Sequence, residues 1–228
     1  MSTSFHPDID KKKYVNKQLI DIIQPIVDIY VSDYKILGTS YLKKLANQNN
    51  PLPLHQDWTV TDETKYGSFT IWIALQDTSK ENGAIRVIPC SHNIDNTLRA
   101  PSIPAGQAFI FNQKLMHASW PNSSKDDRLA LTIGLTPKEA ELFMLYYDKK
   151  SEEIQEYTMP DDLFLHYPEI IEKPLIGTFK KKYSYKLPRF TEQHFLNQLY
   201  LNRMQYTTLE PLFANPEHQQ FFEKNGYI

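Results

Sequence analysis

Two histidines and one aspartate of this chain could together bind a metal ion. His55 and Asp57 are separated by one residue on a predicted short strand, where residues two apart point to the same face. His117 ends another predicted strand. Two imidazoles and one carboxylate at strand ends would bind Fe(II) on one face and leave the opposite positions open. Dioxygen chemistry requires such open positions, so the pattern predicts an iron site.

A fourth residue, Arg128, predicts an anionic ligand beside that ion. It begins a strand whose next residues, 129–135, cannot pair its charge, and an unpaired charge among apolar residues is costly. The planar guanidinium suits bidentate capture of a carboxylate better than the point charge of a lysine does. A dicarboxylate could therefore chelate the metal with one end and contact Arg128 with the other.

The elements that must position these residues are short β-rich runs separated by turn-forming residues. Apolar residues at three-to-four spacing predict a helix over residues 11–33, before the first of these runs. This series of short β-rich runs after a helix predicts an all-β core, an antiparallel barrel or jelly roll, with flanking α-helices. The predicted strands are Tyr34–Leu45, Leu54–Val60, Ser68–Gln76, Ala84–Pro89, Gln107–His117 and Arg128–Leu135.

The chain beyond Pro137 carries weaker patterns. Residues 140–147 allow a strand or a helix, and residues 148–188 are predicted to be an irregular segment that covers the barrel mouth. Helices are predicted over Thr191–Tyr206 and Pro216–Asn225. The lysine runs 11–13 and 180–182 are interpreted as solvated faces. We predict one domain over residues 1–228, with the N-terminal helix at 11–33, the β core at 34–137 and the covering segment at 138–228.

Composition excludes several classes of protein. Of the residues, 41% are hydrophobic and 23% charged, which is typical of a globular chain. The formal net charge is −2 and the charges are dispersed, so no basic surface for nucleic-acid binding is expected. No apolar run approaches the roughly 18 residues that span a membrane. The single Cys90 cannot form an internal disulfide. A cytoplasmic protein without nucleic-acid or membrane partners is expected.

Three segments resemble the phytanoyl-CoA dioxygenase family of Fe(II)/2-oxoglutarate-dependent oxygenases. They are His55-Gln-Asp-Trp58, the run from Ile71 to His92 that contains Glu-Asn-Gly-Ala-Ile-Arg-Val-Ile-Pro-Cys-Ser-His, and the segment from His117 to Arg128. They keep the family's order, and the resemblance covers about residues 35–137. Agreement across three segments is far more specific than any single motif.

The resemblance implies a double-stranded β-helix, that is, a cupin-like jelly roll, as a single oxygenase domain. It implies that His55, Asp57 and His117 hold iron and that Arg128 binds the distal carboxylate of 2-oxoglutarate. Trp72 and Ser119 would contact the cosubstrate. The family's chemistry converts 2-oxoglutarate and O2 to succinate and CO2, and usually hydroxylates the substrate. A small organic molecule is the expected substrate.

Two departures and two alternatives accompany this interpretation. Cys90 replaces the family's turn glycine, and a segment like the family's N-terminal one stands at Pro216–Ile228, as in a fragment, a split gene product or a permuted variant. The main alternative is a non-catalytic jelly-roll module that binds a metal or a ligand. A zinc hydrolase could use the same two His and Asp, but Arg128 argues against it because hydrolysis needs no dicarboxylate anchor. Asp57 argues against halogenation, where relatives lack that carboxylate.

Overall fold

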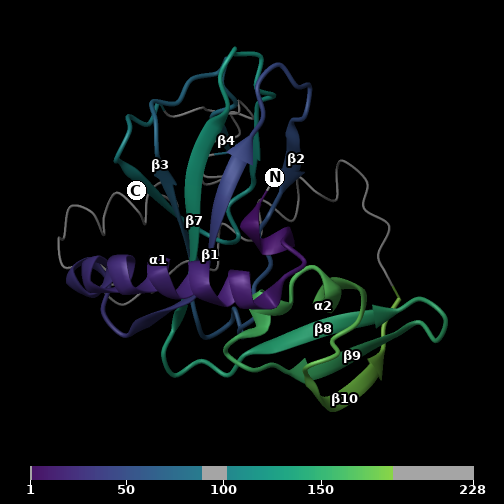
Figure 1. Cartoon of the computed structure of the whole chain (residues 1–228). Helices are drawn as coiled ribbons and strands as arrows, with labels where there is room; N and C mark the ends of the chain where they lie inside the picture. The colour runs from purple at the N-terminus through teal and green to yellow at the C-terminus, as the bar shows by residue number, and fades with distance from the viewer. Residues whose placement is uncertain (1, 89–101, 187–228) are drawn as a thin grey trace.

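Two antiparallel sheets face each other and form the body of the protein (Figure 1). The computed structural model describes residues 2–88 and 102–186. Successive strands of the chain alternate between the two sheets, which is the winding of a jelly roll. The first sheet has the order β1 (Tyr34–Lys44), β7 (Arg128–Pro137), β3 (Phe69–Ala74) and β5 (Ala108–Asn112), and the second β2 (Leu52–His55), β6 (His117–Ser119) and β4 (Ile85–Val87). The predicted fold class is confirmed.

Strand β3 shows how the core is built on both sides of the first sheet. Phe69 and Ile71 point outward into one hydrophobic cluster, and Trp72 and Ala74 point inward into another. A strand buried on both faces reads as a near-continuous apolar run, as β3 does. The inner cluster also contains Ile85 and Val87 of β4, so the two sheets pack against each other.

Helix α1 (Ile9–Tyr30) covers the outer face of the first sheet (Figure 1). The Asp8 carboxylate caps it by accepting from the backbone N–H groups of residues 10 and 11. Leu19 and Val27 are the buried apolar residues that it adds to the outer cluster. Lys12 of this helix departs from the predicted solvated face, because it is buried and its Nζ donates to the Tyr167 carbonyl. No helix in the described part of the chain is long and apolar enough to cross a membrane.

The segment after β7 folds differently from the predicted irregular covering. It forms a third sheet, in the order β10 (Thr178–Ser184), β9 (Glu153–Thr158) and β8 (Phe143–Asp148), together with the short helices η2 (Leu163–His166) and α2 (Glu169–Glu172). A cluster that contains Leu37, Leu142 and Leu163 joins this unit to the barrel. All six residues of β9 are half-buried, so neither face of this strand is clearly apolar. Apolar and polar residues therefore do not alternate clearly along it, and the sequence does not indicate a strand.

The predicted strand Gln107–His117 is also wrong, because it is two strands in different sheets. The chain turns after β5, where the Asn112 side chain accepts from the Lys114 N–H and the Asn112 carbonyl accepts from the Leu115 N–H. Asparagine favours such turns. His117 therefore begins β6 instead of ending a long strand. The predicted helices at 191–206 and 216–225 and the Cys90 turn lie outside the described residues.

Candidate metal centre

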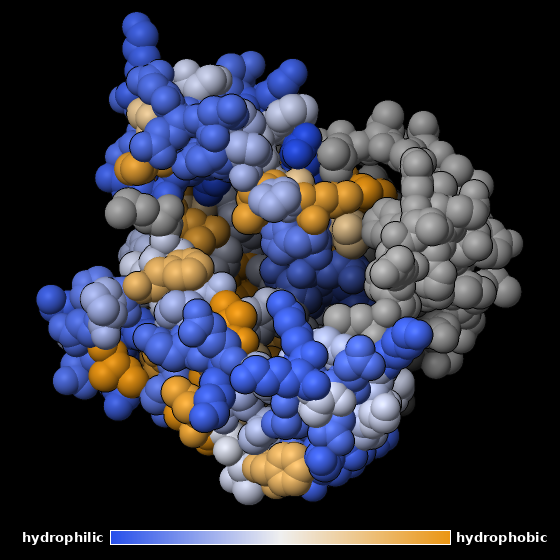
Figure 2. Space-filling model, turned by 90° about the vertical axis from the view of Figure 1, so that its right-hand side faces the viewer, coloured by the Kyte–Doolittle hydropathy of each residue, from blue (hydrophilic) through white to orange (hydrophobic). Residues whose placement is uncertain are grey.

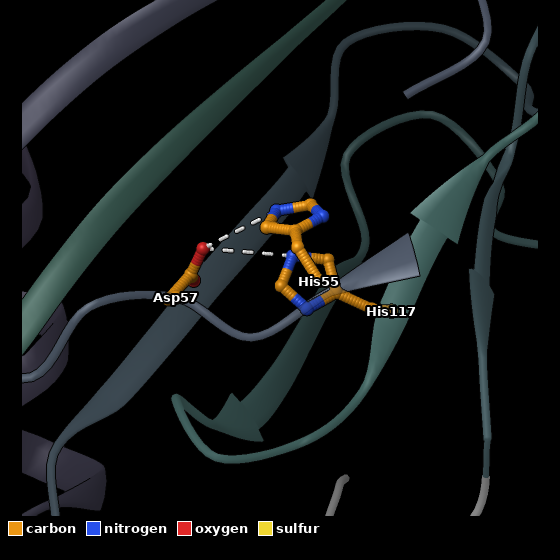
Figure 3. Close-up of side chains that lie close together, drawn as sticks. All are labelled: His55, Asp57 and His117. Atoms are coloured by element: carbon orange, nitrogen blue, oxygen red, sulfur yellow. Dashed lines mark ion pairs between the residues drawn. The ribbon is translucent and has the colours of Figure 1, made fainter. Parts of the chain in front are cut away.

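His55, Asp57 and His117 converge at one end of the second sheet (Figure 3). His55 ends β2 and His117 begins β6, and these two residues are register partners. Asp57 Oδ1 lies 3.7 Å from His55 Nε2 and 3.6 Å from His117 Nε2. Their potential ligand atoms all lie within 4.8 Å of one another. The structure thus brings together the three predicted ligands.

Backbone carbonyls orient both imidazoles toward this point. His55 Nδ1 lies 2.8 Å from the Pro53 carbonyl, and His117 Nδ1 lies 3.0 Å from the Leu115 carbonyl. A carbonyl can only accept, so each Nδ1 carries the proton and each Nε2 keeps a free lone pair. Such partners fix the tautomer and ring orientation of metal-binding histidines.

Asp57 is positioned differently from the sequence expectation. It lies in the loop after β2, so the pleat of a strand does not aim it toward His55. Its backbone N–H donates to the Gln113 carbonyl at 3.0 Å, and its Oδ2 accepts from Thr70 Oγ1 at 2.7 Å. Oδ1 is the oxygen left facing the two imidazoles.

The chemistry of this donor set fits Fe(II). Two His and one carboxylate on one face are the ligands of non-haem iron oxygenases, in which other coordination positions stay open. His117 is buried, and this burial lowers the pKa of its imidazole. The neutral form, which offers the lone pair to a metal, is therefore favoured at His117.

Arg128 is a buried cation with unused donors. The residue is 4% exposed, and of its side-chain nitrogens only Nη2 has a hydrogen-bond partner among the described residues, the Gly83 carbonyl at 3.2 Å. Nε and Nη1 are buried without a partner in that part of the chain. Burial lowers the Arg128 pKa to about 10. The guanidinium lies 5.2 Å from the centre of the Trp72 ring. Unsatisfied buried donors are costly, so this end of the site suits an anion.

Lys44 adds a second buried cation that the sequence analysis missed. It is the register partner of Arg128 across β1 and β7, and its Nζ donates to Ser119 Oγ at 2.5 Å. Burial, and then the charges of Arg128 and Arg86, lower the Lys44 pKa to about 8. Like charges directly opposite each other on a sheet are destabilising, and an anion between them would relieve this repulsion. Period-two alternation from Ser40 through Leu42 was the signal that could have placed Lys44 on the inner face.

One cavity of about 310 Å³ joins the two histidines and Asp57 to Arg128, and Lys44 contacts its lining through Ser119. All six residues proposed from the sequence line it: His55, Asp57, Trp72, His117, Ser119 and Arg128. Its lining also includes Trp58, Phe164 and Tyr167. The ring centroids of Trp58 and Tyr167 lie 5.4 Å apart. The space-filling view shows a hollow near the centre of one face, with hydrophobic side chains at its edge (Figure 2). The site therefore combines a cationic part with an aromatic part.

The chain matches one family model and is similar to several known proteins. The sequence model described as "Phytanoyl-CoA dioxygenase (PhyH)" matches residues 2–130. The chain is 33% identical over 99 residues to "Dioxygenase trt7" of Aspergillus terreus (strain NIH 2624 / FGSC A1156), an alignment that covers 37% of this chain and 35% of that one. It is 26% identical over 136 residues to "Phytanoyl-CoA dioxygenase domain-containing protein 1 homolog" of Dictyostelium discoideum, covering 47% and 48%.

The chain thus spans between about a third and a half of the length of these curated relatives. Among solved structures, "CytC3 with Fe(II) and alpha-ketoglutarate" is similar, with a TM-score of 0.41 and 17% identity over 54% of this chain and 51% of that one. The family model matches more than half of the present chain. The resemblance in the motifs is confirmed, and the chain belongs to the phytanoyl-CoA dioxygenase family.

Proposed function

We propose that this protein is an Fe(II)- and 2-oxoglutarate-dependent dioxygenase that hydroxylates a small organic molecule. In this proposal residues 1–228 act as a single oxygenase domain. The observation that carries the proposal is the cavity that joins two different kinds of site. It holds two imidazoles and one carboxylate, together with a buried guanidinium whose Nε and Nη1 have no partner among the described residues. A metal site alone needs no such cation.

His55 Nε2, Asp57 Oδ1 and His117 Nε2 would hold the iron. When bound, the iron supplies coordination and reduction of O2, coupled to oxidation of 2-oxoglutarate. Asp57 contributes the anionic protein ligand, which favours Fe(II) over a monovalent ion. The hydrogen bonds at both Nδ1 atoms hold the two imidazole rings, so that the Nε2 lone pairs already face the metal position before a metal binds.

Arg128 and Lys44 would bind the distal carboxylate of 2-oxoglutarate. Arg128 Nε and Nη1 offer two donors, as bidentate capture requires. Ser119 contacts Lys44 Nζ and lines the same cavity, so its hydroxyl could also reach that carboxylate. The Trp72 ring lies beside Arg128 and would restrict the orientation of the cosubstrate.

The substrate would lie on the aromatic side of the cavity, near Trp58, Phe164 and Tyr167. Aromatic walls bury apolar parts of a ligand and exclude water. The reaction balances as substrate, O2 and 2-oxoglutarate giving hydroxylated substrate, succinate and CO2. One oxygen atom enters the substrate C–H bond, and the other enters succinate.

The test is succinate formation by the purified protein with Fe(II), 2-oxoglutarate and air, measured by mass spectrometry. Many oxygenases oxidise 2-oxoglutarate slowly without substrate, so an unknown substrate does not prevent the test. Asp57→Ala and a sample reconstituted with Zn(II) serve as inactive controls. Binding of iron and 2-oxoglutarate without any succinate would favour the alternative, a non-catalytic binding module.

A further inference from the structure

We propose that Thr70 is a positioning residue of the metal centre: its hydroxyl fixes the Asp57 carboxylate so that one oxygen, Oδ1, faces both imidazoles. The inference rests on the metal-binding function proposed above. It assigns a role to a residue outside the predicted ligand set. The observation that supports this role is the hydrogen bond of 2.7 Å from Thr70 Oγ1 to Asp57 Oδ2.

Asp57 needs such a partner because its backbone does not aim its side chain. It lies beyond the last residue of β2, and its side chain is 30% exposed. The bond from its N–H to the Gln113 carbonyl holds the main chain but leaves the side-chain torsions free. The terminal torsion of an aspartate is broad and roughly two-fold, so either oxygen could face the imidazoles.

Thr70 supplies a rigid donor. It belongs to β3, which pairs with β5 on one side and β7 on the other, and its register partners are Phe111 and Gly134. Thr70 is buried, and a β-branched side chain on a strand has few χ1 choices. Gly134 has no side chain that could compete for the hydroxyl. The donor therefore stays where the central sheet places it.

The consequence concerns how the carboxylate binds a metal. With Oδ2 held by Thr70, Asp57 offers one oxygen and leaves the remaining coordination positions to other ligands. Without the hydroxyl, the carboxylate can rotate, chelate with both oxygens or bond elsewhere. Partners of this kind typically alter metal affinity by about 10–100-fold when removed.

The test measures Co(II) binding to the apo protein and the visible absorption spectrum of the complex, which reports coordination number. Thr70→Val removes the hydroxyl and keeps the shape, and Thr70→Ser keeps the hydroxyl. Thr136→Val is the matched control, because Thr136 is a fully buried threonine of β7 whose hydroxyl has no partner among the described residues. Thr70→Val should weaken Co(II) binding about tenfold or more and change the spectrum. Thr70→Ser should restore both, and Thr136→Val should match the wild type.

Failure of this inference is distinguishable from failure of the metal site. Wild-type affinity and spectrum in Thr70→Val would overturn the role of Thr70 while Asp57→Ala still lost the metal. A lower melting temperature of Thr70→Val with unchanged Co(II) binding would show a structural role only, and would also overturn it. Absence of Co(II) binding by the wild type, or full binding by Asp57→Ala, would overturn the proposed metal site and this inference with it. If Thr70→Val does not fold, Thr70→Ala gives the same comparison.

Discussion

His55 and His117 face each other across β2 and β6, with ring centroids 4.2 Å apart and ring planes inclined by 51°. The register shifts between Leu52 and His55, so β2 has one more residue than β6 between the two paired positions. Such an irregularity re-aims a side chain and is common beside active sites. The sheet thereby brings two imidazoles together, and the loop after β2 supplies the carboxylate.

Asp57→Ala should remove most of the bound iron, because it deletes the anionic member of the proposed ligand set. We expect metal affinity to fall at least about tenfold. The measurement is iron content by mass spectrometry after anaerobic reconstitution and desalting. Asp62→Ala is a control, since Asp62 pairs with Lys65 and is absent from the cavity lining. Equal iron in Asp57→Ala and wild type would contradict the assignment.

The sequence could predict the site residues better than the elements that carry them. The spacing of His55 and Asp57 suggested a shared strand face, yet Asp57 lies in a loop. Its carboxylate reaches the imidazoles because Thr70, distant in sequence, holds it there. Tertiary hydrogen bonds of this kind leave no local pattern. His55 and Asp57 therefore lie close together for a physical reason other than a shared strand face.

Of the other differences, one has a local cause and one depends on tertiary packing. Asn112, Gln113 and Lys114 interrupt an apolar run that otherwise reads as one strand, and they form the turn between two sheets. Helix α1 was easier to predict from the sequence, because the spacing of its apolar residues and its Asp8 cap lie within one segment. Lys44 was missed because a lysine at the end of a strand is usually solvated, and its burial depends on packing against β6 and β7.

Arg128→Ala should raise the apparent KM for 2-oxoglutarate by roughly 30-fold or more, because a bidentate charge-assisted pair in a buried site contributes about 2–4 kcal/mol. Arg128→Lys should fall between the two, since it keeps the charge and loses the planar fork. Iron content should stay at the wild-type level in both variants. Succinate release during 2-oxoglutarate titration measures the effect, and an unchanged KM in Arg128→Ala would place the anchor elsewhere.

Binding of 2-oxoglutarate should weaken as pH rises above about 8, where Lys44 loses its proton, since its pKa is lowered to about 8 by burial and by the charges of Arg128 and Arg86. A bound carboxylate favours the charged amine and raises that pKa. Above pH 8 the complex therefore takes up a proton as it forms, and its affinity falls by up to about tenfold per pH unit. Below pH 8 the amine is already charged, so this dependence disappears.

The measurement for Lys44 is the dissociation constant of 2-oxoglutarate for the Co(II)-loaded protein, determined anaerobically between pH 6.5 and 9.5. Lys44→Met removes the titrating amine, so it should bind 2-oxoglutarate more weakly at pH 7 and lose the decline near pH 8. A decline that persists unchanged in Lys44→Met would assign it to another group.

Gly38→Ala should destabilise the fold, while Gly134→Ala, its register partner across β1 and β7, should not. A Cβ at Gly38 would lie 2.9 Å from Cβ and 3.1 Å from Cγ of Phe164, so η2 or the strand must shift. Overpacking of this kind costs about 1–3 kcal/mol, which is about 2–12 °C in melting temperature for a chain of this size. A Cβ at Gly134 would meet nothing closer than 3.8 Å, at Gln113 Nε2. Both glycines line the cavity, so an added methyl group would narrow it in either variant. A lower melting temperature in Gly38→Ala alone would therefore come from the contact with Phe164 and not from the narrower cavity. Thermal unfolding of the two variants measures the difference, and equal melting temperatures would show that Phe164 of η2 does not pack tightly on the barrel.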